Sequence, residues 1–457
     1  MRSEGQSSQK RVSDSLAAIG ADSDINAFLG VRADEATREA MACDAQRTAG
    51  GSLGPLHGVT LAIKDNIQVA GLPCTGGTPA LRSCIAEQDA GVITRLKAAG
   101  AIVIGKSNMH ELAFGITSDN EAFGAVHNAR RYAHIAGGSS GGTAAAIASG
   151  MVMAGLGTDT GGSCRIPAAL NGIVGFRPTS GRYPSDGLIR ISHTRDTVGP
   201  MASTVADVST LDAVLTQDIA PDDTVNLEDL RLGVPRSYFY SDLEPEVAEG
   251  MAQTLDRLAD AGVTLMDVEL PGIDSLNEKI GFPLVLYEAR QLLEDYLANN
   301  CPEVQLEALV AGVASPDVRQ VMDAVLRGDI SSEAYTQALD THRPVLQEMY
   351  RDCFRQHRLD ALVFPTTPLT ARPIAGSRDC IDLNGRRAPT FLTYIRNTDP
   401  GSNAGIPGIS LPAPVDAGAM PVGIELDGPE YSDRRLLAIG IAIERLLAEG
   451  NPGHASI

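Results

Sequence analysis

Apolar residues are spaced along this chain in two ways, one typical of buried strands and the other of helices. Short apolar runs predict strands at residues 59–64, 101–104, 232–235, 263–268, 360–365, 405–411 and 421–426. Apolar residues three or four positions apart predict helices at residues 12–29, 34–47, 90–99, 204–215, 244–261 and 433–447, with Ser203 as the N-cap of the fourth. This alternation predicts an α/β protein.

Residues 275–357 differ from the rest because their pattern is almost wholly helical and more polar. We interpret them as a helical insertion that covers one side of the sheet. The sequence contains no internal repeat, low-complexity tract or long linker that would mark a second domain. Residues 1–457 are therefore expected to form one large α/β domain.

The composition excludes some partners without naming a reaction. Of the 457 residues, 43% are hydrophobic, and the formal net charge is −20. Nucleic acids and anionic membranes both require a basic face, so neither is an expected partner.

The seven cysteines form no Cys-x-x-Cys motif and no Cys/His cluster, so neither structural zinc nor another metal is expected. Scattered, unpaired cysteines fit a reducing compartment. Residues 1–12 lack the apolar core of a signal peptide, and the small apolar stretch 143–156 is too short to span a bilayer. A cytoplasmic protein is the expectation.

Two Gly-Gly-Ser steps, at residues 137–139 and 161–163, stand out as candidate chemistry. Glycine permits backbone torsions that other residues avoid, so successive N–H groups can converge on an anion. A hydroxyl directly after such a turn, as at Ser163, is well placed as a nucleophile. Lys64 ends the strand in which Val59, Leu61 and Ile63 alternate, and burial there would lower its pKa towards a useful range for a base.

Together with Lys64, the stretch 137–165 closely resembles the amidase signature family, and the resemblance extends from about residue 26 to the C-terminal helix. It implies a central mixed β-sheet flanked by helices on both faces. It also implies a catalytic set in which Ser163 is the nucleophile and Lys64 is the base. Ser139, after a non-proline cis peptide bond, passes protons between them. No cofactor is implied.

The same resemblance predicts that the backbone N–H groups of Thr160, Gly161, Gly162 and Ser163 hold the oxyanion. Arg165 could pair with Asp159 to fix this loop or contact the substrate directly. Cys164 is interpreted as a small buried filler. Residues near these motifs in the sequence are candidates for the substrate pocket; they are Met109, Phe114, Ile116, Thr117, Ile191, His193 and residues 394–397.

The Gly-rich stretch is also compatible with two other classes of protein. Residues 138–142 also match Gly-x-Ser-x-Gly, which would make Ser140 the nucleophile of an α/β-hydrolase. That enzyme needs a later histidine, but His342, His357 and His454 lie in helical or terminal surroundings. A nucleotide-binding loop is the other alternative, although no lysine follows these glycines as in a P-loop.

Within the family, residues 192–200 and 397–407 look most like soluble bacterial amidases of the indoleacetamide and mandelamide hydrolase type. We therefore expect hydrolysis of a small or aryl-acetamide-type amide by a homodimer. A biuret or urea-derivative amidohydrolase and a glutamine-hydrolysing amidotransferase subunit remain the alternatives.

Overall fold

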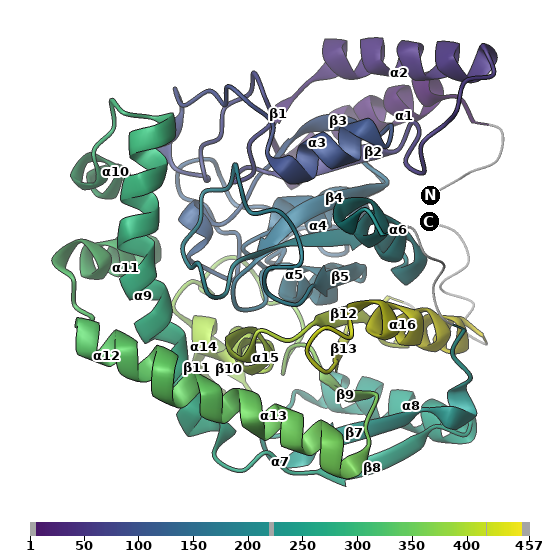
Figure 1. Cartoon of the computed structure of the whole chain (residues 1–457), viewed down its shortest axis with the longest axis vertical. Coiled ribbons are helices and arrows are strands. Elements are labelled where there is room, and N and C mark those ends of the chain that lie inside the picture. Colours follow the sequence, from purple (N-terminus) through teal and green to yellow (C-terminus); the bar gives the residue numbers. More distant parts are fainter. Residues whose placement is uncertain (1–5, 219–223, 417, 450–457) are drawn as a thin grey trace.

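The fold is built on one twisted sheet of eleven strands in the order β1-β3-β2-β4-β6-β5-β12-β13-β9-β7-β8 (Figure 1). The computed structural model describes residues 6–218, 224–416 and 418–449. In sheet order the strands are Phe28–Val31, Ile102–Ser107, Thr60–Lys64, Ala154–Asp159, Thr197–Ala202, Val174–Arg177, Gly408–Pro412, Gly423–Asp427, Ala361–Pro365, Arg231–Pro235 and Thr264–Val268. Parallel and antiparallel pairs both occur, which confirms the predicted mixed sheet.

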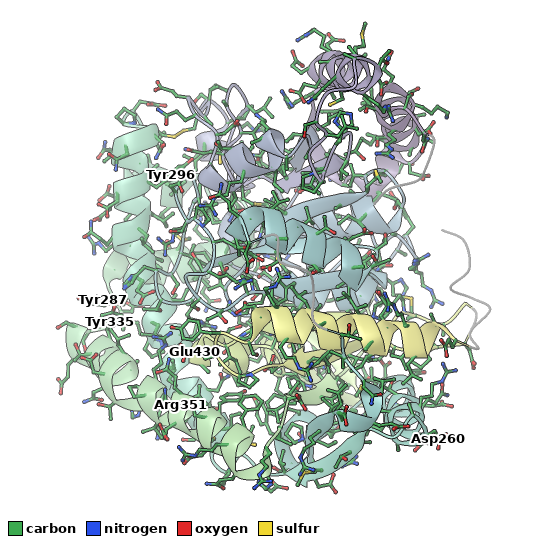
Figure 2. The ribbon with its side chains drawn as sticks, turned by 45° about the vertical axis from the view of Figure 1, so that its right-hand side comes forward. Asp260, Tyr287, Tyr296, Tyr335, Arg351 and Glu430 are labelled. Atoms are coloured by element: carbon green, nitrogen blue, oxygen red, sulfur yellow. A yellow bond between two sulfur atoms is a disulfide. The ribbon has the colours of Figure 1, made fainter. Side chains whose placement is uncertain are left out.

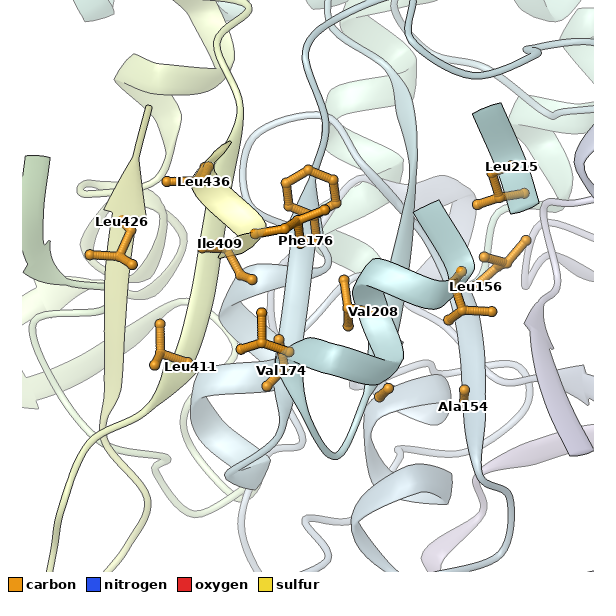
Figure 3. Close-up of a cluster of buried hydrophobic side chains, with 14 of the residues drawn as sticks. Ala154, Leu156, Val174, Phe176, Val208, Leu215, Ile409, Leu411, Leu426 and Leu436 are labelled. Carbon is orange, nitrogen blue, oxygen red and sulfur yellow. The ribbon is translucent and has the colours of Figure 1, made fainter. Parts of the chain in front are cut away.

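Helices cover both faces of this sheet, as predicted. One face carries α3 (Gly91–Ala98), α6 (Val205–Thr216), α8 (Pro245–Asp260) and α16 (Asp433–Ala448). The other carries α1 (Ser8–Ala21), α2 (Ala33–Thr48), α4 (Gly141–Ala148) and α5 (Arg165–Asn171). Figure 3 shows the first of the two apolar layers, where side chains of β4, β5, β12 and β13 meet α6 and α16.

Strand β2 shows how the sequence pattern assigns side chains to the two faces. Successive side chains of a strand point to opposite faces. Leu61 and Ile63 accordingly pack into the layer of α3 and α6, whereas Ala62 packs into the layer of α4. Lys64 is two residues after Ala62, so its side chain points to the same face of the sheet, the one that α4 covers.

The polar segment after β8 folds into helices, which lie along the left and lower edges of the molecule in Figure 1. They are α9 (Ile273–Asn300), α10 (Leu306–Gly312), α11 (Pro316–Arg327), α12 (Ser332–Gln337), the π-helical turn Ala338–His342 and α13 (Arg343–His357). Stacked rings of Tyr287 and Tyr335, with centroids 4.2 Å apart, join α9 to α12 (Figure 2). The Glu111 carboxylate accepts the N–H groups of Ala314 and Ser315 and so attaches this segment to the loop after β3.

Several predicted elements need correction. The helix expected at 12–29 ends at Ala21, and Phe28–Val31 instead forms the edge strand β1, antiparallel to β3. The N-cap of α6 is Thr204 rather than Ser203, because the Thr204 hydroxyl accepts the Asp207 N–H. The remaining α-helices and strands of the described residues are α14 (Thr390–Ile395), α15 (Asp399–Ala404), the four-residue α7 (Arg236–Phe239) and the hairpin of β10 (Cys380–Leu383) and β11 (Arg386–Pro389).

The expectation that all cysteines are unpaired is wrong for two of them. Cys84 and Cys301, separated by 217 positions in the sequence, form a disulfide with their Cα atoms 5.7 Å apart. The other five cysteines are unpaired, and all seven lie in the described part of the chain. The bond joins the loop before α3 to the end of α9. No helix among the described residues is long and apolar enough to cross a membrane.

The N-terminus of α6 generates a prediction about pH. There Glu444 of α16 accepts the N–H of Val205, and burial raises the pKa of Glu444 to about 7. A carboxyl whose pKa rises on folding destabilises the protein progressively as pH rises from about 4.5 to 7. We expect Glu444→Gln to raise the free energy of unfolding by about 2–3 kcal/mol at pH 8 and to leave it nearly unchanged at pH 4.

Urea unfolding at both pH values measures this difference. Glu307→Gln, at an exposed position of α10, is the matched control and should stay within about 0.5 kcal/mol of wild type. An equal effect of Glu444→Gln at the two pH values would contradict the account.

Candidate active site

Lys64 is completely buried at the carboxyl end of β2. Strands β2 and β4 are parallel neighbours, so their carboxyl ends lie at the same edge of the sheet. The Lys64 Nζ atom is 2.8 Å from Ser139 Oγ, 2.7 Å from Thr158 Oγ1 and 3.3 Å from the Thr158 carbonyl oxygen. Removal from water lowers the pKa of Lys64 to about 8. A substantial neutral fraction is therefore present near pH 8.

Ser139 precedes α4, and the peptide bond between Gly138 and Ser139 is cis. Its side chain is fully buried, as is that of Lys64. Gly157 of β4 lets the start of α4 lie close to this strand, because a Cβ atom at Gly157 would be only 2.6 Å from Ser140 Oγ. The start of α4 can therefore contact the end of β4 directly.

The two Gly-rich stretches meet through a backbone hydrogen bond of 3.1 Å, from the N–H of Ser140 to the carbonyl of Ser163. Ser163 retains 8% of its exposure and Thr160 retains 9%, whereas Lys64 and Ser139 are fully covered. Of the three residues Lys64, Ser139 and Ser163, which we call the serine–lysine group, Ser163 is thus the one that solvent reaches, and Lys64 and Ser139 are covered.

The backbone donors around Ser163 differ in one respect from the sequence expectation. The N–H of Gly162 donates to Asp159 Oδ1 at 2.8 Å, so it is engaged inside the loop and is not free to bind an oxyanion. The N–H groups of Thr160, Gly161 and Ser163 have no acceptor among the residues that the structure describes. Three of the four expected donors are therefore available.

Arg165 lies beneath this loop and is fully buried. Its guanidinium donates to both Asp159 oxygens at 3.1 Å, to Glu425 Oε1 at 2.7 Å and to Ser402 Oγ at 2.7 Å. The Asp159 carboxylate also accepts the Cys164 N–H at 3.0 Å. The suggestion that Arg165 contacts the substrate is therefore replaced by the other suggestion, in which Arg165 pairs with Asp159 and fixes the loop that carries Ser163.

The rival nucleophile Ser140 is occupied elsewhere. Its hydroxyl donates to the Thr158 carbonyl at 3.2 Å and accepts the Thr158 N–H at 3.3 Å. Burial raises the pKa of Cys164 to about 12, so this thiol remains protonated, as expected of a buried filler. His342 and His357 lie within the helical segment that ends with α13, and His454 lies outside the described residues.

The candidate pocket residue Ile116 lies against the backbone at Gly138, which precedes Ser139. Its carbonyl carbon would be 3.0 Å from a Cβ atom at Gly138, and its side chain belongs to an apolar cluster with Ile166 and Tyr394. Met109 is fully buried next to Gly77, and its place in a substrate pocket stays a prediction.

Four neighbours of the group were not singled out from the sequence. Thr158 and Asn66 contact each other near Lys64, with Asn66 Nδ2 3.0 Å from Thr158 Oγ1. Asp196 accepts the Thr160 hydroxyl at 2.6 Å, and the Thr398 hydroxyl donates to the Gly161 carbonyl at 2.6 Å. A small cavity opens beside the first three of these residues and is lined by Asn66, Ala113, Thr158, Thr160, Leu188, Ile189, Arg190, Ile191 and Asp196. Asp196 lies in the stretch 192–200 and Thr398 in the stretch 397–407, which both resemble particular amidases. That resemblance is the feature of the sequence that could have indicated these two residues.

Comparison with known proteins decides the family. The Amidase family model matches residues 11–437. The chain belongs to the amidase signature family. This amidase is 45% identical to an indoleacetamide hydrolase of Rhizobium radiobacter, over 93% of the chain and 90% of that protein. It is 42% identical to the mandelamide hydrolase of Pseudomonas putida, over 95% of the chain and 87% of that protein.

A solved structure described as an amidase superposes with a TM-score of 0.86 at 34% identity, covering 97% of this chain and 96% of the other. The likeness thus extends over the sheet and the helical segment together. This amidase is an enzyme that hydrolyses amide C–N bonds and is not a peptidase.

The buried position of Arg165 generates a prediction about stability. Arg165→Met would leave Asp159 and Glu425 without their shared cation, so we expect a loss of about 3–5 kcal/mol in the free energy of unfolding. Urea unfolding measures the loss. Arg351→Met is the matched control, because Arg351 pairs with Glu348 at 2.6 Å on the outer side of α13 and should cost less than about 1 kcal/mol (Figure 2). Similar losses for the two variants would contradict the role of Arg165.

Proposed function

We propose that this amidase hydrolyses a primary amide with an arylacetyl or similarly small acyl group to the carboxylic acid and ammonia, with Ser163 as the nucleophile. The observation that carries the proposal is the 2.8 Å contact between the buried Lys64 Nζ and Ser139 Oγ, next to the hydrogen bond that joins Ser140 to Ser163. Because its pKa is lowered, part of the Lys64 population is neutral near neutral pH and can accept a proton, whereas an ordinary surface lysine is already protonated.

In the first half of the reaction, the Ser163 oxygen attacks the amide carbonyl carbon. Its proton passes to Ser139, whose own proton passes to Lys64. The N–H groups of Thr160, Gly161 and Ser163 donate to the resulting oxyanion. The C–N bond then breaks, the proton returns through Ser139 to the leaving nitrogen, and ammonia departs.

In the second half, water attacks the acyl ester on Ser163. Water gives one proton to the same relay, and a second tetrahedral intermediate forms in the same set of donors. Collapse of this intermediate breaks the ester bond, and the relay returns its proton to Ser163. One amide and one water thus yield one acid and one ammonia, with the enzyme unchanged.

The choice of acyl group rests on the relatives and on the surroundings of Ser163. The relatives described above act, by name, on indoleacetamide and mandelamide, which both carry an aromatic group near the amide. Apolar side chains of Ile116 and Ile166, beside partly buried Phe391 and Ile395, form one cluster that reaches the nucleophile loop. The biuret-type and glutamine-hydrolysing alternatives are not favoured. A homodimer and a cytoplasmic location remain predictions from the sequence.

Ammonia release from phenylacetamide, indoleacetamide, biuret and glutamine tests the assignment. We expect Ser163→Ala and Lys64→Met to lower kcat for the aryl amides by about 10³-fold or more, since each removes one member of a group that acts as a unit. Ser140→Ala is the matched control, and it should keep most of the activity. An active Ser163→Ala beside an inactive Ser140→Ala would establish the α/β-hydrolase mechanism instead.

The ionisation of Lys64 makes a second prediction. Because the base must be neutral to accept a proton and its pKa is about 8, kcat/KM should rise with pH through about 8 and then level off. Initial rates with phenylacetamide between pH 6 and 10 measure the profile. A profile that is flat or that falls across this range would rule out Lys64 as the base.

A further inference from the structure

The peptide group between Gly161 and Gly162 is held at both of its polar atoms. Its carbonyl oxygen accepts the Thr398 hydroxyl at 2.6 Å, and its N–H donates to Asp159 Oδ1 at 2.8 Å. The oxygen and the hydrogen of a trans peptide lie in one rigid plane and point in opposite directions across the C–N bond. The two hydrogen bonds therefore fix the orientation of this plane from opposite directions.

Such fixing is needed because two successive glycines have more backbone freedom than any other pair. Gly162 has φ +136°, a value that side chains rarely allow. A Cβ atom at Gly162 would lie 2.2 Å from Thr398 Oγ1, and one at Gly161 would lie 2.9 Å from Asp399 Oδ1. Side chains thus cannot restrain this loop from within, and its contacts with neighbouring residues must do so.

Thr398 is itself firmly placed. It is fully buried at the N-cap of α15, and its N–H donates to the Ile395 carbonyl at 3.1 Å. Its carbonyl accepts Arg165 Nη2 at 3.1 Å and Ser402 Oγ at 3.0 Å. Because Arg165 also binds Asp159, one guanidinium fixes both residues that hold the peptide. Thr398, Asp159 and Arg165 thus restrain the loop together. Of their contacts with the peptide, only the one from the Thr398 hydroxyl can be removed without also removing a charge.

We propose that Thr398 is a positioning residue for the oxyanion donors. Its hydroxyl holds the Gly161–Gly162 peptide so that the N–H groups on either side, those of Gly161 and Ser163, stay aimed at the oxygen of the tetrahedral intermediate. Donors preorganised in this way favour the transition state over the bound substrate. This inference rests on the proposed function of Ser163.

The experiment compares Thr398→Val, which keeps the shape and removes the hydroxyl, with Thr398→Ser, which keeps the hydroxyl. Benzylboronic acid is the probe for the tetrahedral state. The Ser163 oxygen forms a B–O bond and yields a tetrahedral boronate anion, while the Ser163 proton enters the Ser139–Lys64 relay. Phenylacetate, the product of phenylacetamide hydrolysis, is the probe for the ground state. Melting temperature reports whether each variant is folded, and Thr398→Ala replaces Thr398→Val if that variant does not fold.

We expect loss of the hydroxyl to weaken boronate binding and to lower kcat for phenylacetamide together, each by about 10- to 100-fold. Phenylacetate binding should change by less than about threefold, and Thr398→Ser should restore both quantities to nearly wild-type values. Boronate binding that is unchanged without the hydroxyl would overturn the proposal. Equal losses for boronate and phenylacetate would overturn it too, because a merely structural role affects both probes.

Ser163→Ala separates this proposal from the function on which it rests. If Ser163→Ala binds the boronate as tightly as wild type, then the nucleophile assignment itself is wrong, whatever the Thr398 variants do. If boronate binding requires Ser163 but is indifferent to the Thr398 hydroxyl, then only the positioning role fails.

Discussion

A lysine side chain removed entirely from water is the constraint around which this structure is arranged. Burial costs the charged form of Lys64 much of its solvation, and the nearby carboxylates of Asp159 and Asp196 offset only part of that cost. The partial compensation leaves the pKa of Lys64 near 8, below that of an exposed lysine. The pleat of β2, the small residues of α4 and the parallel alignment of β2 with β4 are all required to deliver the lysine to this position.

A second buried group of charges holds the other side of the site. Arg165 joins Asp159 of β4, Glu425 of β13 and the start of α15, which lie far apart in the sequence. Buried ion pairs add little to stability by themselves, but their geometry is demanding, and loss of one member is costly. In this enzyme that geometry serves the backbone of residues 160–163. The loop can therefore be rich in glycine and still be rigid.

The sequence was sufficient for the parts of the fold that repeat a local pattern. Leu61 and Ile63 revealed β2, and the apolar runs of β7 and β9 were equally clear. The edge strand β1 was mistaken for helix because its four residues pair only with β3, a contact that local spacing cannot reveal. The Thr204 cap was missed by one position because two hydroxyl residues stand side by side. Pairs far apart in the sequence, such as Cys84 with Cys301 or Thr398 with Gly161, come together only through the order of the strands in the sheet. Local sequence patterns do not specify that order, so these pairs were not predicted.

The proposed mechanism requires Ser163 to be the nucleophile, and trapping the acyl-enzyme tests this requirement most directly. Wild-type enzyme would be mixed with an activated phenylacetyl ester and quenched in acid within the first turnover, and its peptides would be sequenced by mass spectrometry. We predict one phenylacetyl group, attached to Ser163. Attachment to Ser140 or Cys164, which lie within the same buried group, would contradict the central claim.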